Sequence, residues 1–371
     1  IMMYSKNSIS LTIKPTNNCN FRCKHCFNGE HLYEKVLLPI ETALKFIELA
    51  AKSYSVIKLT FHGGEPTLAG KEYYKQIFDL EHKLIDSHGV KFHNIFQTNG
   101  YLLDESFIDM LVKEKTLISV SFDGPHNDIL RSHTEDIYNT LEIIKNKDVR
   151  LRVFCVETAK SVSDLIQTYE WFKTHKLDYK ILPVQPRGFA EDQFDLILDI
   201  PEYIEKLMEL YHYWLTDKDC NIRFYTLEEF AHLRENSEFK PLWFDRKLSL
   251  NSDGKIYPFG RPYDVNFCLG DPSSVVSIDD CFKSDSYNEL KQILKDKIIK
   301  TCNTCEAFSI CRGSCLCSSF VYGNSSDMLE YSCKLAEKTF MNVVKINNEV
   351  IKDIEEGNTD KYNPRALKIF S

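Results

Sequence analysis

The chain has 371 residues, of which 43 % are hydrophobic, and it carries a formal net charge of −8 at pH 7. That size supports a buried core and up to two domains, whereas the acidic balance and the scattered Lys and Arg residues argue against a nucleic-acid partner. The sequence has no apolar run of about 18 residues and no signal-peptide core at its start, so we expect no membrane partner and a cytoplasmic location.

Short apolar runs alternate with helical patterns over the first two hundred residues. Six runs predict β-strands, at 8–15, 56–63, 93–100, 117–124, 149–158 and 179–186. Apolar residues at i, i+3, i+4 spacing predict helices between them, at 39–54, 71–89, 104–115, 136–147 and 162–176. Six βα units are too few for a closed eight-stranded barrel. We therefore expect an α/β fold, either a partial (β/α)6 TIM-type barrel or an open parallel sheet.

The composition changes after the sixth predicted strand. Residues 201–245 predict a helical linker, and 247–260 predict a hairpin that turns at Ser252, Asp253 and Gly254. The predicted division is a barrel at 1–200, the linker, a small cysteine-rich domain at 246–335, and a C-terminal helix and tail at 336–371.

Thirteen cysteines in a chain without an export signal indicate metal or redox chemistry rather than disulfides. Three of them lie between Cys19 and Cys26, and six lie between Cys302 and Cys333. Two metal regions at opposite ends of the chain are therefore predicted, with four cysteines outside them: Cys155, Cys220, Cys268 and Cys281.

Polar motifs follow the predicted strands at the ends where a parallel sheet gathers its active-site loops. The first is Cys19, Cys23 and Cys26 in C-x3-C-x2-C spacing, and "HGGEP", "QTNG" and "SFDGP" follow the next three strands. Three thiolates suit an iron–sulfur cluster with one iron left open. A zinc site that takes a nitrogen of His25 as its fourth ligand is the alternative.

The C-x3-C-x2-C loop after the first strand of a partial barrel resembles that of the radical S-adenosylmethionine (SAM) enzymes. The resemblance implies that Cys19, Cys23 and Cys26 hold a [4Fe–4S] cluster whose open iron chelates SAM. One electron then splits SAM into a 5′-deoxyadenosyl radical, which takes a hydrogen atom from the substrate. The implied partners are a substrate and an electron donor such as flavodoxin or ferredoxin.

The same resemblance assigns SAM contacts to the other strand-end motifs. Glu65 would meet the SAM amino group and Arg131 its carboxylate. Asn99, like Thr98, is either a site residue or a turn former, and His62 is a candidate substrate contact. The remaining cofactor-binding candidates come from "GGEP" and "SFDGP": Gly63, Gly64, Pro66, Ser121 and Asp123.

The C-terminal cysteines resemble half of a SPASM domain, which occurs in peptide-modifying radical SAM enzymes. The resemblance implies one auxiliary [4Fe–4S] cluster, and a zinc knuckle is the competing interpretation. The implied cluster ligands are Cys302, Cys305, Cys311 and Cys333.

The ligands of a second auxiliary cluster are incomplete. SPASM domains place a cysteine at the end of a G-x4-C pattern after the hairpin turn. In the pattern that starts at Gly254 this position is Phe259, and no cysteine lies between Cys220 and Cys268. Either this cluster is lost, with aromatic residues such as Tyr257, Phe259 and Tyr263 in its space, or substitutes hold it. The candidate metal ligands are Cys315, Cys317 and Cys268, with Cys281 a further possible substitute.

We interpret the chain as a radical SAM enzyme that modifies a peptide. A maturase that forms thioether or carbon–carbon crosslinks in a ribosomally made precursor is favoured over an anaerobic sulfatase-maturating enzyme, because the latter places a catalytic aspartate directly after the absent cysteine. Asp264 is the nearest candidate base. Without an added leader-binding domain, the precursor would bind the barrel mouth, the 201–245 helices or a separate partner. The alternative from another class is a non-catalytic iron–sulfur electron carrier.

Overall fold

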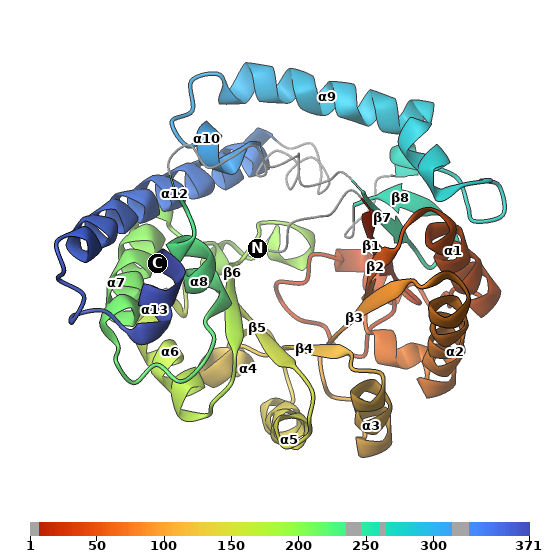
Figure 1. Ribbon diagram of the computed structural model, residues 1–371, viewed down its shortest axis with the longest axis horizontal. Helices are drawn as coiled ribbons and strands as arrows, with labels where there is room; N and C mark the ends of the chain where they lie inside the picture. Colours follow the sequence, from red (N-terminus) through yellow and green to blue (C-terminus); the bar gives the residue numbers. More distant parts are fainter. Residues whose placement is uncertain (1–6, 235–245, 260–264, 314–325) are drawn as a thin grey trace.

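The computed structural model describes residues 7–234, 246–259, 265–313 and 326–371. Strands and helices alternate through the first half of the chain in the predicted order (Figure 1). The six strands of this half are β1 (Ser8–Ile13), β2 (Val56–Phe61), β3 (Lys91–Thr98), β4 (Leu117–Ser121), β5 (Leu151–Glu157) and β6 (Tyr179–Pro183).

These six strands form a parallel sheet in which each strand pairs with its neighbour in sequence. Five of the six residues of β1 are buried, as expected where side chains fill one face of a parallel sheet and helices cover the other. Among the described residues the sheet ends at β6 on one side and at β8 on the other, so the barrel stays open. The predicted partial barrel is confirmed.

Amphipathic helices cover the outer face of the curved sheet (Figure 1). In α1, for example, Ala43, Phe46, Ile47 and Ala50 recur on one face and are all buried. The covering helices are α1 (Ile40–Ser53), α2 (Lys71–His88), α3 (Glu105–Lys113), the short α4 (Asn127–Leu130), α5 (Thr134–Lys145) and α6 (Leu165–Thr174).

The predicted hairpin continues the same sheet. Strand β7 (Lys247–Leu250) pairs in parallel with β1, and β8 (Ile256–Pro258) pairs antiparallel with β7. The Asn251 amide donates to the Lys255 carbonyl at 3.1 Å and closes the turn. The cysteine-rich region is therefore joined to the barrel through the sheet, and the division of the chain at residue 246 stays a prediction.

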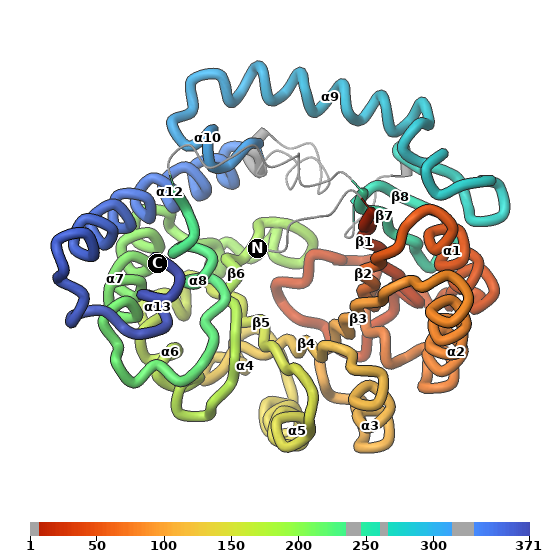
Figure 2. Tube along the Cα trace, viewed as in Figure 1, coloured from red at the N-terminus to blue at the C-terminus, as the bar shows by residue number. Residues whose placement is uncertain are grey.

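Helices make up most of the remaining chain. Helix α9 spans the side on which the arc of strands is open, from the hairpin to α10 and α12 (Figures 1 and 2). Helix α12 packs on α7, where the Tyr211 hydroxyl donates to Asn347 Oδ1 at 2.7 Å. The helices are α7 (Ile200–Thr216), α8 (Tyr225–Ala231), α9 (Asp285–Cys302), α10 (Phe308–Cys311), α12 (Ser326–Glu355) and α13 (Pro364–Phe370).

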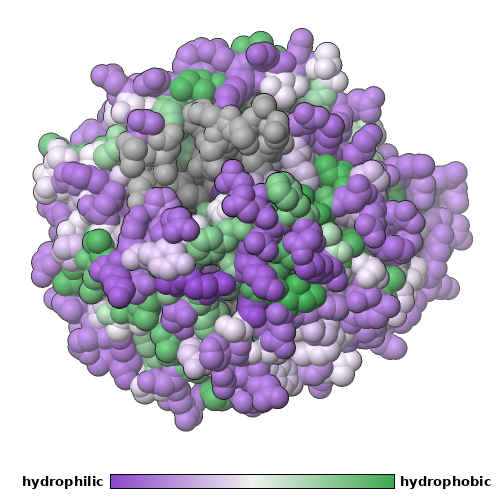
Figure 3. Space-filling view, turned by 180° about the vertical axis from the view of Figure 1, so that it is seen from behind, coloured by the Kyte–Doolittle hydropathy of each residue, from purple (hydrophilic) through white to green (hydrophobic). Residues whose placement is uncertain are grey.

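Hydrophilic residues cover most of the face seen from behind, and apolar residues are scattered between them (Figure 3). Within the ranges that the structure describes, no helix is both long enough and apolar enough to cross a bilayer.

Candidate active site

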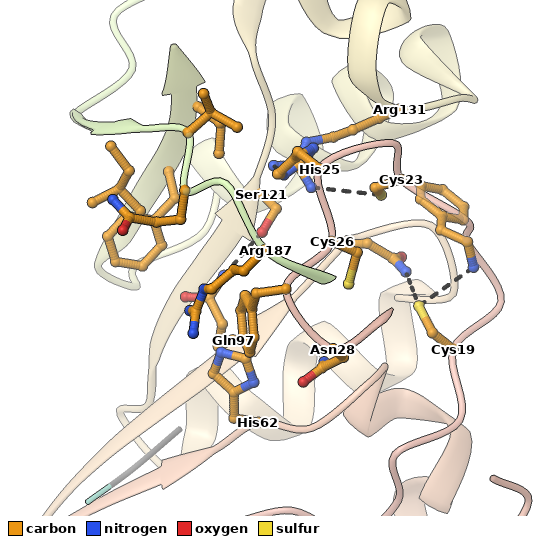
Figure 4. Close-up of a pocket in the computed structure, with 18 of the residues that line it drawn as sticks. Cys19, Cys23, His25, Cys26, Asn28, His62, Gln97, Ser121, Arg131 and Arg187 are labelled. Atoms are coloured by element: carbon orange, nitrogen blue, oxygen red, sulfur yellow. Dashed lines mark hydrogen bonds between the residues drawn. The ribbon is translucent and has the colours of Figure 1, made fainter. Parts of the chain in front are cut away.

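A cavity of about 610 Å³ opens where the strands of the barrel end (Figure 4). Its wall combines the loops that follow β1, β2, β3, β4 and β6 with one face of α12. That volume lies in the usual range for sites that enclose a small molecule. The predicted position of the active site, beyond the carboxyl ends of the strands, is therefore where the structure has its cavity.

The loop after β1 brings three thiols to this cavity. Cys19, Cys23 and Cys26 all line it, and each is partly exposed. Phe21 anchors the loop with a buried ring, and its backbone N–H points at Cys19 Sγ at a distance of 3.3 Å. The three cysteines that the sequence groups together therefore share one space.

Two glycines hold the loop after β2 against this cysteine loop. A Cβ on Gly64 would lie 2.1 Å from the Asn17 carbonyl oxygen, and one on Gly63 would lie 2.2 Å from that of Thr16. Both distances are far inside van der Waals contact, so only glycine allows the two backbones to approach this closely. The Gly64 amide uses the approach to donate to the Thr16 carbonyl at 3.0 Å.

Glu65 lies behind the cavity wall and is 1 % exposed. Its carboxylate accepts hydrogen bonds from the Thr67 amide and hydroxyl, the Thr98 hydroxyl and the Asn99 amide, at 2.7–3.0 Å. It thereby ties the β2 loop to the end of β3 and fixes Asn99, whose side chain lines the cavity. The predicted contact of Glu65 with the SAM amino group stays a prediction, as does a role for the buried Pro66.

The "SFDGP" motif divides between the cavity and the core. Ser121 lines the cavity and accepts from Gln97 Nε2 at 3.1 Å. Asp123 is buried behind it and receives Arg131 Nε at 2.8 Å, as well as the Val156 amide at 2.7 Å. Asp123 therefore positions Arg131 in this structure, and its predicted direct contact with SAM stays a prediction.

Arg131 lies in the cavity wall beside the thiols (Figure 4). Burial acts against its charge, but Asp123 and Cys23 outweigh burial and raise the pKa of the guanidinium. Its Nη1 points at Cys23 Sγ at 3.8 Å. A fixed cation in this place suits a ligand carboxylate or a thiolate.

The thiols fit an iron–sulfur cluster. Burial raises the pKa of Cys19 to about 12 and that of Cys26 to about 11, so a thiolate here needs a metal cation to compensate it. N–H donors already point at the sulfur atoms, from Phe21 and Arg131 and from Asn99 Nδ2, which lies 3.9 Å from Cys19 Sγ. Such donors are among the features by which proteins tune iron–sulfur clusters.

His25 is poorly placed for the alternative zinc site. Its Nε2 lies 3.2 Å from Arg131 Nη2, so a metal ion at that nitrogen would meet a fixed positive charge. Burial, followed by the charge of Arg131, lowers the pKa of His25 well below 6.5. The ring is therefore a neutral part of the cavity wall.

The C-terminal cysteines approach one another at the end of α9. Cys302 is its last residue, Cys311 ends α10, and both are buried. Burial and then the charges of Cys311 and Cys305 raise the pKa of Cys302 to about 11, which reflects the proximity of the three thiols. That they hold one metal centre stays a prediction.

Cys333 lies on α12, the helix on which α10 packs. The pKa of Cys305 is raised by burial and also by Glu337, which follows Cys333 by one helical turn. Residues four apart lie on the same helix face. Cys333 therefore shares a face of α12 with Glu337, and its place in the predicted ligand set stays a prediction.

Of the other candidate ligands, the two that the structure describes, Cys268 and Cys281, lie near each other and not in this group. Cys268 lies near the buried Cys281, whose pKa burial raises to about 12 with a smaller contribution from Cys268. Phe259 is buried in the hairpin, at 3 % exposure. The remaining predicted residues, Cys315, Cys317, Tyr263 and Asp264, lie outside the described residues.

Sequence reasoning missed part of the cavity wall. Gln185 and Arg187 follow β6 and line the cavity, and their position after a strand could have identified them. Gln97 belongs to the "QTNG" motif and Asn28 follows the cysteine loop, but neither was named as a site residue. No local pattern points to the contributions of α12, which are Ser332, Leu335 and Ala336.

Comparison with known proteins supports an iron–sulfur cluster at the three thiols of the cavity. The profile of the Radical SAM superfamily matches residues 13–171. The chain is 25 % identical over 374 residues to a cysteine-type anaerobic sulfatase-maturating enzyme of Clostridium perfringens, covering 92 % of this chain and 99 % of that one.

Two solved structures are similar in fold. Native anSMEcpe with bound AdoMet and Cp18Cys peptide gives a TM-score of 0.74 at 22 % identity and covers 92 % of this chain and 99 % of its own. SuiB of Streptococcus suis, bound to S-adenosylmethionine, gives a TM-score of 0.60 at 17 % identity. The match covers 86 % of this chain and 76 % of the SuiB chain.

The cofactors are those of the matched superfamily, a [4Fe–4S] cluster and SAM, and the three-thiol cavity at the strand ends fits them. The zinc alternative at Cys19, Cys23 and Cys26 is set aside. Residues 13–171 therefore carry a radical SAM domain.

Proposed function

We propose that this radical SAM enzyme oxidises a side chain in a peptide or protein, with the reaction of the anaerobic sulfatase-maturating enzymes as the first candidate. The similarity to such an enzyme extends over 92 % of this chain and supports this candidate better than the peptide crosslinking that the sequence favoured. In this reaction a cysteine or serine side chain becomes an aldehyde.

The observation that carries the proposal is that one cavity joins the three thiols to the C-terminal part of the chain. Cys19, Cys23 and Cys26 lie in the same cavity wall as Leu335 and Ala336 of α12. A substrate that enters between the barrel and α12 therefore reaches the thiol end of the cavity. The apolar side chains of β5 and β6 that line it, such as Val156 and Leu182, would exclude water from the reacting groups.

When bound, the reduced cluster supplies one electron to SAM, and the resulting 5′-deoxyadenosyl radical takes a hydrogen atom from the substrate. Oxidation of a cysteine side chain to an aldehyde then needs loss of one more electron and a proton, followed by exchange of sulfur for water oxygen. An auxiliary cluster would take up such an electron, and Cys302, Cys305, Cys311 and Cys333 are the residues that would hold it. Asp264 is the candidate for the base.

Peptide crosslinking is the second candidate, and Phe259 is the observation that favours it. Phe259 stands where the sulfatase-maturating pattern has its cysteine, the next residue is Gly260 instead of aspartate, and the ring is buried. Aromatic rings fill apolar space and offer no ligand or base. Of the two reactions, only the sulfatase-maturating one is assigned a catalytic aspartate at this place.

A single assay separates the two candidates. The reconstituted enzyme, SAM and dithionite are incubated with capped peptides that contain both cysteine and serine, and the products are treated with a hydrazide and with a thiol alkylating reagent. Oxidation to an aldehyde predicts hydrazide capture. A thioether crosslink predicts a product that has lost hydrogen and resists both reagents, whereas a carbon–carbon crosslink predicts the same loss of hydrogen with a thiol that is still alkylated. If no peptide is changed while 5′-deoxyadenosine is formed, the peptide substrate class is wrong, and if no 5′-deoxyadenosine is formed, the chain is a carrier.

A further inference from the structure

Helix α12 brings a buried hydroxyl group to the cavity, that of Ser332. Ser332, Leu335 and Ala336 lie three and four positions apart, so they share the face of α12 that forms part of the cavity wall. Ser332 is 9 % exposed, and within the part of the chain that the structure describes its Oγ has no hydrogen-bond partner. The site as described so far gives this hydroxyl no role.

A hydroxyl inside a helix can find a partner within the helix itself. Serine and threonine can donate to the carbonyl oxygen four residues earlier, and on α12 the Thr339 hydroxyl does so, to the Leu335 carbonyl at 2.7 Å. Ser332 makes no such bond. A buried hydroxyl without a partner lowers stability, because it has left water and gained no hydrogen bond in return. Such groups are rare in folded proteins, and one that lines a cavity is available to a ligand.

The other side chains that β5, β6 and α12 bring to the cavity are apolar. Of the described lining residues on these three elements, Ser332 alone carries a polar side chain. A ligand that packs against such a surface loses its hydrogen bonds to water, and the Ser332 hydroxyl can replace one of them. The apolar lining residues of the three elements are Phe154, Val156, Leu182, Pro183, Leu335 and Ala336.

Two observations favour a peptide over SAM as the ligand of Ser332. Helix α12 lies outside residues 13–171, which match the Radical SAM superfamily, so the sequence common to that superfamily does not account for this hydroxyl. A peptide carries an N–H and a C=O group at almost every residue, and each needs a partner when it is buried. A hydroxyl can donate to the C=O group or accept from the N–H group.

We propose that Ser332 is a positioning residue that forms a hydrogen bond with the backbone of the substrate peptide, at one of the two amides that flank the modified residue. The inference rests on the proposed peptide substrate. Such a bond would fix the peptide against α12 while its side chain reaches the thiol end of the cavity.

Ester analogues of a peptide test for a backbone hydrogen bond, because an ester lacks the N–H group of an amide and its carbonyl is a weaker acceptor. Three probes are used: capped Ala-Cys-Ala, and two analogues in which an ester replaces the amide before or after the cysteine. Their binding to the reconstituted enzyme, oxidised and saturated with SAM, is measured by calorimetry. Because no product is formed in this measurement, its result can be read even if the proposed reaction is wrong.

Ser332→Ala should weaken the binding of capped Ala-Cys-Ala by about five- to tenfold, the net contribution of one hydrogen bond, and should leave SAM binding unchanged. One of the two esters should bind the unaltered enzyme more weakly by a similar factor. The same ester should cause no further loss in Ser332→Ala, because both changes remove the same bond.

The stability of the free enzyme gives a second measurement. The thermal midpoint of Ser332→Ala should equal or exceed that of the unaltered enzyme, because the variant loses a buried hydroxyl that has no partner. Thr339→Val is the matched control, since it removes a buried hydroxyl of the same helix that has a partner and lies outside the cavity wall as described. It should lower the thermal midpoint and keep the affinity for the peptide.

Several results would overturn the inference. If the unaltered enzyme binds none of the three probes, the peptide substrate class is wrong as well, whereas equal binding of capped Ala-Cys-Ala to Ser332→Ala overturns the inference alone. Losses from the ester and from Ser332→Ala that add up would show that they concern different bonds. Weaker SAM binding in Ser332→Ala that accounts for the lost peptide affinity would assign the hydroxyl to SAM. A Ser332→Ala variant that is less stable, or does not fold by circular dichroism, would show that the hydroxyl has a structural role.

Discussion

The two cysteine regions of the molecule are built in different ways. At the barrel, three thiols come from one eight-residue loop, which backbone contacts through Gly63, Gly64 and Gly188 hold in place. At the other end, four thiols come from α9, the turn after it, α10 and α12. The first site is fixed by local backbone packing, whereas the second depends on how separate helices pack.

This difference has a chemical consequence. Close backbone packing leaves the barrel thiols little freedom to move, which suits a cluster that must hold SAM in one geometry. A site assembled from helix ends suits a cluster that only has to accept or pass electrons. The predictions below test this contrast, beginning with the largest expected effect.

Loss of the barrel thiols should abolish activity. The triple variant Cys19→Ala, Cys23→Ala, Cys26→Ala should form no 5′-deoxyadenosine above background, because the ligands of the SAM-binding cluster are gone. Cys220→Ala is the matched control, since Cys220 lies outside both regions and donates to the Ile222 carbonyl. Chromatographic assay of 5′-deoxyadenosine measures both, and cleavage by the folded triple variant would refute the assignment.

The variant Gly64→Ala should reduce the formation of 5′-deoxyadenosine almost as much as loss of the three thiols does. Gly64→Ala places a Cβ against backbone oxygen, so the cysteine loop must shift, and a shift of about 1 Å costs roughly 100-fold in rate. In the C-terminal hairpin, the Cβ of Gly254→Ala would lie 4.0 Å from its nearest neighbour at φ +76°. It should cost only about 1–2 kcal/mol of stability. If Gly64→Ala and Gly254→Ala form 5′-deoxyadenosine at equal rates, backbone packing does not distinguish the barrel site from the C-terminal region.

The dependence of stability on pH should come from the barrel. Every carboxyl with a raised pKa in the described ranges lies before residue 200, and burial raises the pKa of Glu81 from 4.5 to about 8. Between these values the folded state keeps a proton that the unfolded state releases. Stability therefore falls as pH rises from about 4.5 to 8, by a few kcal/mol for this group.

The variant Glu81→Gln should lose the part of this pH dependence of stability that comes from Glu81. Urea unfolding at pH 5 and pH 8 measures it, and Glu72→Gln, which changes an exposed carboxylate of the same helix, is the control. If the free energy of unfolding changes between pH 5 and pH 8 by the same amount in both variants, Glu81 does not titrate in this range.

The smallest expected effect is a change in iron content. Two clusters predict about eight irons per chain, and a second auxiliary cluster would raise this to about twelve. Cys302→Ala combined with Cys311→Ala should lower the content to about four, while Cys268→Ala should leave it unchanged. A loss of iron in Cys268→Ala would place that cysteine in a cluster.

The sequence predicted the features that depend on neighbours along the chain. The six strands and the Cys19 to Cys26 loop are such features, because periodicity and contiguous motifs define them. The motifs did not show that Glu65 and Asp123 bond to the ends of neighbouring strands, since a motif fixes the residue type and not the partners of its side chain. Leu335 of α12 reaches the cavity only through tertiary packing. Helix α9 was missed because its apolar stripe of Tyr287, Leu290 and Leu294 is sparse.

The transfer of hydrogen from peptide to SAM tests the central claim most directly. The reconstituted enzyme, SAM and dithionite are incubated with a library of capped peptides that carry deuterium on every carbon, and 5′-deoxyadenosine is analysed by mass spectrometry. The proposed function predicts deuterium in the 5′-deoxyadenosine, and none when the same peptides carry ordinary hydrogen. Abundant 5′-deoxyadenosine without deuterium would contradict a peptide substrate.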